Sequence, residues 1–105
     1  MLADAQLSAL SDPTRRRIVE LLHRSPSSVR ELTDRLPVSQ PAVSQHLKVL
    51  RQARLVRSTP VGASNVYALD PQGLAAVRSW LESVWDDVLE AFAEAATITP
   101  KESPR

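Results

Sequence analysis

The sequence contains no cysteine and only two glycines, and aromatic residues make up 4% of its 105 residues. The missing thiols exclude disulfides, thiolate catalysis and cysteine-ligated metals. No apolar run approaches the roughly 18 residues that a membrane-spanning helix requires. The acidic, amphipathic start MLADAQLSAL has no basic region before an apolar core, so we expect no signal peptide. These absences predict a cytoplasmic protein with no membrane partner.

The length suits one domain with a modest core, which dimerisation often completes. The end of the chain, TITPKESPR, is polar and contains proline. We therefore expect one domain over residues 1–96, which both binds DNA and dimerises, and a disordered tail over residues 97–105.

The net charge of +1 conceals an uneven distribution. Residues 1–57 carry ten basic and five acidic side chains, whereas residues 58–105 carry three basic and seven acidic ones. A basic front and an acidic back suit a protein that presents one face to a polyanion, although both halves could simply be solvated.

Four helices are predicted in the first half of the chain from their start signals. Leu7 lies on the apolar face of a short first helix within residues 3–12. Asp12 followed by proline starts the second helix, a capping box beginning at Ser28 starts the third, and Ser39 caps the fourth, which runs from Gln40 to about Ala53. About three residues separate the third helix from the fourth, which is the spacing of a helix-turn-helix.

The second half of the chain changes its periodicity. Residues 55–59 and 65–69 alternate like strands, and the gap between them holds Pro60 and Gly62, which predicts a two-stranded hairpin. A long helix follows over residues 71–95. The predicted fold class is mainly α with a small β-hairpin, in the order helix, helix, helix, helix, strand, strand, helix, a winged helix-turn-helix.

The predicted fourth helix is unusual in its exposed side chains. Val43, Leu47 and Leu50 form its buried stripe, and no carboxylate lies between Ser39 and Arg57. A helix built only for solubility more often carries Glu–Lys pairs. Glutamine and serine can read base edges in the major groove, and cations farther along can reach the phosphates. The candidate base-contacting residues are Ser39, Gln40, Ser44 and Gln45.

A second group of residues is predicted to contact phosphates from this helix, the second helix and the hairpin. Arginines in the first turn of the second helix oppose the helix dipole, a conflict that an external anion would relieve, although they could equally extend into water or pair with an acidic side chain. His46 has either this role or a structural one. The candidates are Arg15, Arg16, His46, Lys48, Arg51, Arg57, Ser64 and Asn65.

Two motifs resemble those of the ArsR-type (ArsR/SmtB) winged-helix transcriptional regulators. ALSDPTRRRIVELL is similar to the second-helix signature of that family, VSQPAVSQHLKVLRQARLV to its recognition helix and first wing strand, and VYALD to its second wing strand. The resemblance covers roughly residues 5–95. It implies a homodimer that binds a palindromic operator in double-stranded DNA and represses transcription.

The chain departs from that family at its metal sites and in its wing. The segment RELTDRL has Thr33 and Asp34 where founding members have a Cys-x-Cys motif, and the last helix has no histidine. We therefore expect a metal-independent branch with no cofactor. In the wing, Ala63 and Ser64 follow Gly62, where many relatives have an arginine, which weakens the contacts expected there.

The last predicted helix carries a stripe of apolar residues that is wider than one contact face requires. One side can close the core, and the resemblance implies that the other joins the first helix in a twofold dimer, although a monomer could wrap both sides. The candidate dimer-interface residues are Leu2, Leu7, Leu10, Trp80, Val84, Trp85, Val88, Leu89 and Phe92.

The leading hypothesis is a sequence-specific DNA-binding repressor, which an unidentified small-molecule inducer could release. The alternative is a winged-helix module that binds proteins and not DNA. An enzyme is not expected, because no Ser-His-Asp order, phosphate loop or metal cluster is present.

Overall fold

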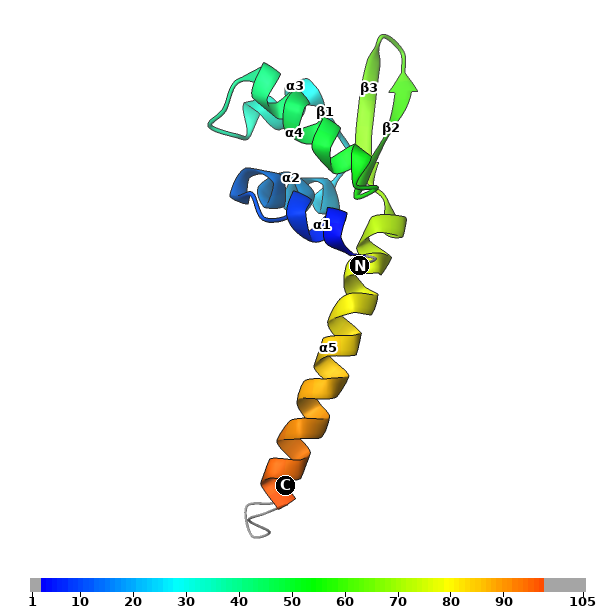
Figure 1. Ribbon diagram of the computed structural model, residues 1–105. Helices are drawn as coiled ribbons and strands as arrows, with labels where there is room; N and C mark the ends of the chain where they lie inside the picture. Colours follow the sequence, from blue (N-terminus) through cyan, green and yellow to red (C-terminus); the bar gives the residue numbers. More distant parts are fainter. Residues whose placement is uncertain (1–2, 98–105) are drawn as a thin grey trace.

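The computed structural model describes residues 3–97, which form a head and a long projecting helix. Figure 1 shows α5 running away from a head built by the other elements, and the molecule measures 64 × 26 × 19 Å. The predicted winged helix-turn-helix is confirmed. The elements are α1 (Asp4–Ala9), α2 (Pro13–Arg24), β1 (Ser27–Ser28), α3 (Val29–Asp34), α4 (Gln40–Gln52), β2 (Val56–Val61), β3 (Ser64–Leu69) and α5 (Pro71–Thr97).

The sheet differs from the predicted hairpin in having a third strand. Its antiparallel order is β1-β3-β2, with Ser27 opposite Tyr67 and Ser28 opposite Val66. The turn is also shorter than predicted, because Pro60 lies inside β2, opposite Asn65. A proline is tolerated there because β2 is an edge strand, where a missing N–H donor leaves no neighbouring strand unpaired.

The predicted helix starts are confirmed by their cap hydrogen bonds. The Asp12 carboxylate accepts a hydrogen bond of 3.0 Å from the backbone N–H of Arg15. Ser28 and Glu31 form the reciprocal capping box, with distances of 3.1 and 2.8 Å. The Ser39 hydroxyl accepts a hydrogen bond of 3.3 Å from the backbone N–H of Ala42. Each cap satisfies a helix N–H that has no partner within the helix.

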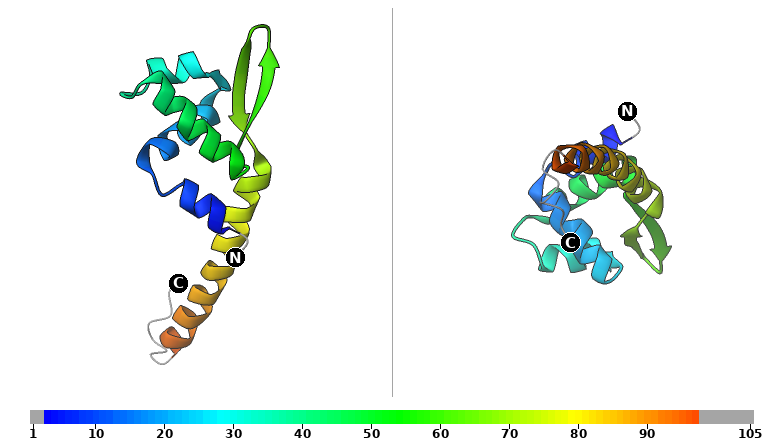
Figure 2. Two further views of the ribbon diagram at one scale, coloured as in Figure 1. Left: turned by 45° about the horizontal axis from the view of Figure 1, so that its top comes forward. Right: turned by 90° about the horizontal axis from the view of Figure 1, so that it is seen from below.

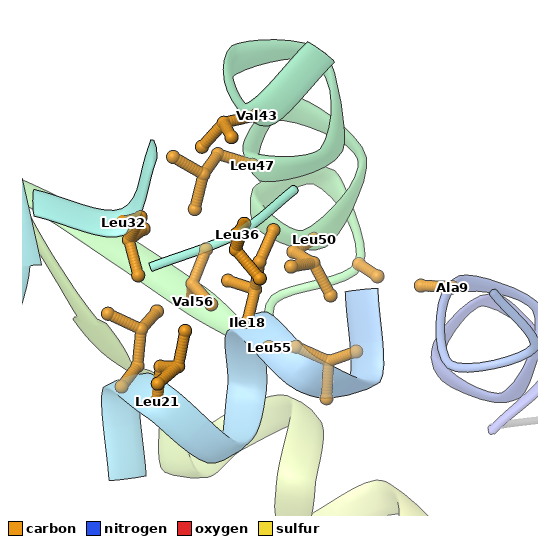
Figure 3. Packing of buried hydrophobic residues seen from close by; sticks show 12 residues of the cluster. Ala9, Ile18, Leu21, Leu32, Leu36, Val43, Leu47, Leu50, Leu55 and Val56 are labelled. Atoms are coloured by element: carbon orange, nitrogen blue, oxygen red, sulfur yellow. The ribbon is translucent and has the colours of Figure 1, made fainter. Parts of the chain in front are cut away.

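The core lies between α2, α3, α4 and the start of the wing. Figure 3 shows the apolar side chains of α4 directed toward those of α2 and α3. This packing confirms the predicted buried stripe of α4 and fixes which side of that helix remains exposed. The largest fully buried side chains are Ile18, Leu32, Val43, Leu47, Leu50, Leu55 and Val56.

The predicted boundary of the domain can be compared with the structure only in part. α5 ends at Thr97, close to the predicted end of the domain, and the rest of the predicted tail lies outside the described residues, as does Leu2. Within residues 3–97, no helix combines the length and apolar character needed to cross a membrane.

Candidate nucleic-acid interface

The structure places the predicted base-contacting residues on one exposed side of α4. The turn of residues 35–39 joins α3 to α4 in a helix-turn-helix, and Figure 2 shows the β2–β3 hairpin standing beside α4 as a wing. Because the buried stripe anchors the opposite side, this face is presented without distorting the core. Its exposed residues are Ser39, Gln40, Ser44, Gln45, Lys48 and Arg51.

A cleft of about 390 Å³ joins the start of α4 to the wing. Gln40 of α4 lines it together with Ser64 and Asn65 of the wing, so three predicted DNA-contacting residues meet at one place. Arg30 of α3 also lines the cleft and is exposed. We did not select Arg30 from the sequence, because only the pairing of β1 with β3 brings the start of α3 beside the wing.

A second cleft, of about 520 Å³, lies where α4 ends and the wing begins. The predicted phosphate-contacting residues Arg51 and Arg57 line it, together with Arg54, which the sequence reasoning missed. Arg51 donates a hydrogen bond of 3.4 Å to the Ser58 hydroxyl. Three guanidinium groups around one cleft, with Asp70 as the carboxylate among its lining residues, make this end of α4 basic.

Arg15 and His46 have partners within the protein. Arg15 donates a hydrogen bond of 2.6 Å from Nε to the carbonyl of Ala9, and its Nη1 lies 3.4 Å from Nδ1 of His46. The same His46 nitrogen lies 4.0 Å from the Asp12 carboxylate. These half-buried side chains tie α1, α2 and α4 together, so phosphate contact by Arg15 and His46 stays a prediction beside a visible structural role.

Arg16 is exposed and donates a hydrogen bond of 2.9 Å to the carbonyl of Leu10. This bond uses Nη1, and a guanidinium carries further N–H donors. Contact between Arg16 and a phosphate therefore stays a prediction that needs no change in the fold.

The helix cap at Asp12 makes the stability of this region dependent on pH. The hydrogen bond from the Arg15 backbone N–H lowers the pKa of the Asp12 carboxyl, and the charges of His46 and Arg15 lower it further against a partial burial that raises it. A lowered pKa in the folded state stabilises the fold above the unfolded pKa of about 3.9. This stabilisation is lost as the pH falls through the folded pKa.

We expect Asp12→Asn to flatten the acid dependence of stability, because asparagine caps a helix as well as aspartate but does not titrate. The measurement is urea denaturation at pH 5 and pH 3 for both proteins. The free energy of unfolding should fall less in the variant between these two pH values. Equal losses in the two proteins would show that Asp12 does not contribute to the acid sensitivity.

The predicted dimer-interface residues lie in two different environments. Leu10 packs against the core of its own chain, and Leu7 and Trp80 are half-buried. From residue 81 to residue 95, every residue of α5 is exposed, so this part of the helix projects beyond the head. Large apolar side chains line its exposed length, namely Leu81, Val84, Trp85, Val88, Leu89 and Phe92.

Within residues 3–97, no three His, Cys, Asp or Glu side chains gather where they could hold a metal ion. The acidic residues of α5 lie along an exposed helix, where Glu82 pairs with Arg78 at 3.1 Å.

The geometry defines a winged helix-turn-helix protein, and comparison with known proteins places it in a family. Residues 12–58 match the sequence model described as "Bacterial regulatory protein, arsR family". The chain is 54% identical over 91 residues to the HTH-type transcriptional regulator Rv2034 of Mycobacterium tuberculosis, which covers 87% of this chain and 85% of that relative. The chain therefore belongs to the ArsR family of bacterial regulatory proteins.

Two further comparisons agree with this assignment. The chain is 32% identical over 73 residues to the transcriptional repressor SdpR of Bacillus subtilis, which covers 70% of this chain and 81% of that one. The solved structure of an ArsR-like transcriptional regulator from Rhodococcus sp. RHA1 matches with a TM-score of 0.77 at 32% identity, covering 92% of each chain. The family and these relatives are transcriptional regulators and not enzymes.

Proposed function

We propose that this chain is a cytoplasmic, non-enzymatic transcriptional repressor that binds a palindromic DNA operator as a homodimer and needs no bound metal. The observation that carries the proposal is the exposed face of α4, which has no carboxylate and lies between two clefts lined by arginines. Such a face matches the alternation of base edges and phosphates along a major groove.

The residues of this face divide by their distance from the start of α4. Gln40, Ser44 and Gln45 lie in the first two turns, which enter the groove in helix-turn-helix proteins. Glutamine can pair with adenine through both a donor and an acceptor. Lys48 and Arg51 lie farther along and would meet phosphates, as would Arg30 and Arg57 beside the wing.

Dimerisation follows from the exposed length of α5. A helix that projects from the head with Trp85 and Phe92 56% and 69% exposed leaves an apolar surface that a second copy would bury. A twofold pair places two α4 helices about one DNA turn apart, so the operator would be a palindrome. Repression is proposed from the name of the Bacillus subtilis relative.

Independence from metals is proposed from the donor atoms that the chain carries. It has no cysteine, and Thr33 and Asp34 occupy α3 and not a pair of thiolates. His23 and His46 lie on different helices, and His46 already lies beside Arg15 and Asp12. A chelator is therefore expected to leave DNA binding unchanged.

The substitution Gln45→Ala tests the reading of bases by α4. We expect it to weaken binding to the promoter of its own gene by about 1–3 kcal/mol while leaving binding to unrelated DNA unchanged. Fluorescence anisotropy with both DNAs at one salt concentration measures the two affinities.

Lys48→Ala is the matched control on the same exposed face of α4. It should weaken binding to both DNAs comparably, because a phosphate contact carries no sequence information. Unchanged promoter binding by the Gln45→Ala protein would contradict the placement of α4 in the groove.

A further inference from the structure

A groove of about 560 Å³ lies between α1, the end of α4 and the first turns of α5. Its position is separate from the exposed face of α4, and the proposed function makes no use of it. Small residues of α5 and the half-buried indole of Trp80 make much of its wall. The lining also includes Gln6 of α1, Arg54 after α4, and Gly73 and Ala76 of α5.

Gln6 lines this groove with an incompletely satisfied amide. Its side chain is 9% exposed, and Nε2 donates a hydrogen bond of 2.7 Å to the carbonyl of Ala53. Oε1 is buried and accepts no hydrogen bond among the described residues. A buried amide oxygen without a donor is costly and rare, and it calls for a partner that the protomer does not supply.

The groove also borders the joint that holds the end of α4. Gln6 of α1 holds the carbonyl of Ala53, the residue that caps α4 at its C-terminus. The backbone N–H of Gly73 in α5 donates a hydrogen bond of 2.8 Å to the carbonyl of Arg54. A Cβ at residue 73 would lie 2.3 Å from that carbonyl oxygen, so only glycine permits this contact. Two residues that line the groove therefore hold the two carbonyls that follow α4.

We propose that this groove is an effector site for a small, uncharged, mostly apolar molecule that carries one hydroxyl or amino donor. The apolar part would pack against Trp80 and the small residues of α5, and the donor would satisfy Gln6 Oε1. Because Oε1 is buried, the donor must draw the Gln6 amide toward the groove. That movement strains the bond to Ala53 and shifts the end of α4, so the ligand weakens DNA binding.

The binding site itself stands on the groove and on Gln6, whereas the effect on DNA rests on the proposed function. The first experiment therefore uses the whole, DNA-free protein with phenol as the probe and anisole as its matched control, because anisole has the same ring but no O–H donor. NMR titrations follow the Gln6 side-chain amide and the Trp80 indole N–H. We expect saturable shifts with phenol below about 10 mM and about fivefold weaker binding of anisole.

Three variants separate the groove from its surroundings. Ala76→Leu should fill the groove and abolish phenol binding, whereas Ala5→Leu, on the exposed side of α1, should retain it. Gln6→Met removes the acceptor at similar length, so phenol and anisole should then bind equally. Circular dichroism establishes that each variant is folded, and Ala76→Leu keeps the test decisive where Gln6→Met is unstable.

Several results would overturn the proposal. These are phenol shifts that do not saturate, unchanged phenol binding in Ala76→Leu, equal binding of phenol and anisole by the unmodified protein, or intermolecular NOEs showing that a second copy of the chain fills the groove. In a second experiment, saturating phenol should lower the affinity for promoter DNA about fivefold or more. Phenol binding without that loss refutes the effector role, whereas phenol binding by a protein with no DNA affinity refutes the proposed function and leaves the site standing.

Discussion

Val88→Asp is expected to produce a folded monomer and to weaken promoter binding by about 100-fold or more, because the two α4 helices would no longer bind as one linked pair. Val88 is 52% exposed and lies in the apolar stripe of α5, beyond the head. A carboxylate placed between two apolar helices would be buried without a partner, which is strongly unfavourable. Sedimentation equilibrium measures the oligomeric state, and circular dichroism measures the fold.

Glu90→Gln provides the control, because residue 90 lies about half a turn away from Val88 on the same exposed helix. This change should leave both the dimer and its affinity for DNA intact. Dimerisation through α5 is contradicted if Val88→Asp remains dimeric, or if it loses DNA binding without any change in oligomeric state.

Leu47→Ala is expected to lower the free energy of unfolding by about 2–5 kcal/mol, because it leaves a cavity where α4 packs on the core. Leu47 is 1% exposed and lies between Val43 and Leu50 in the buried stripe (Figure 3). Since small domains are stable by only about 5–15 kcal/mol, this single loss would be a large share of the total. Urea denaturation followed by circular dichroism measures the change.

Gln45→Ala on the exposed side of the same helix is the counterpart in this stability measurement. It should change the free energy of unfolding by less than about 0.5 kcal/mol. Together the two variants separate the residue that holds α4 from the residue that it presents. Equal stability of Leu47→Ala and the unmodified protein would contradict the packing of α4 on the core.

The helices were predictable from the sequence because their signals are local. Asp12, Ser28 and Ser39 each cap a helix through a hydrogen bond to a backbone N–H three residues ahead. The period of α4 likewise placed its buried stripe correctly. Signals of this kind need no knowledge of the rest of the fold.

Features that depend on distant pairing were not predictable in the same way. β1 has only two residues, too few for an alternating pattern, and its pairing with β3 is what brings Arg30 to the wing. Arg54 likewise reached the second cleft through the turn after α4. The sequence also could not show that Arg15 is held by Ala9 and His46, since those partners lie on other elements.

Binding of DNA by α4 is tested most directly by a titration of the unmodified protein with fluorescent promoter DNA and with a shuffled DNA of equal composition. The proposed function predicts tighter binding to the promoter, and an affinity that falls about a thousandfold or more between 50 and 200 mM salt as several phosphate contacts per dimer are screened. Equal affinity for the two DNAs would contradict sequence-specific reading. Binding that is absent or insensitive to salt would contradict the interface itself and favour a module that binds proteins.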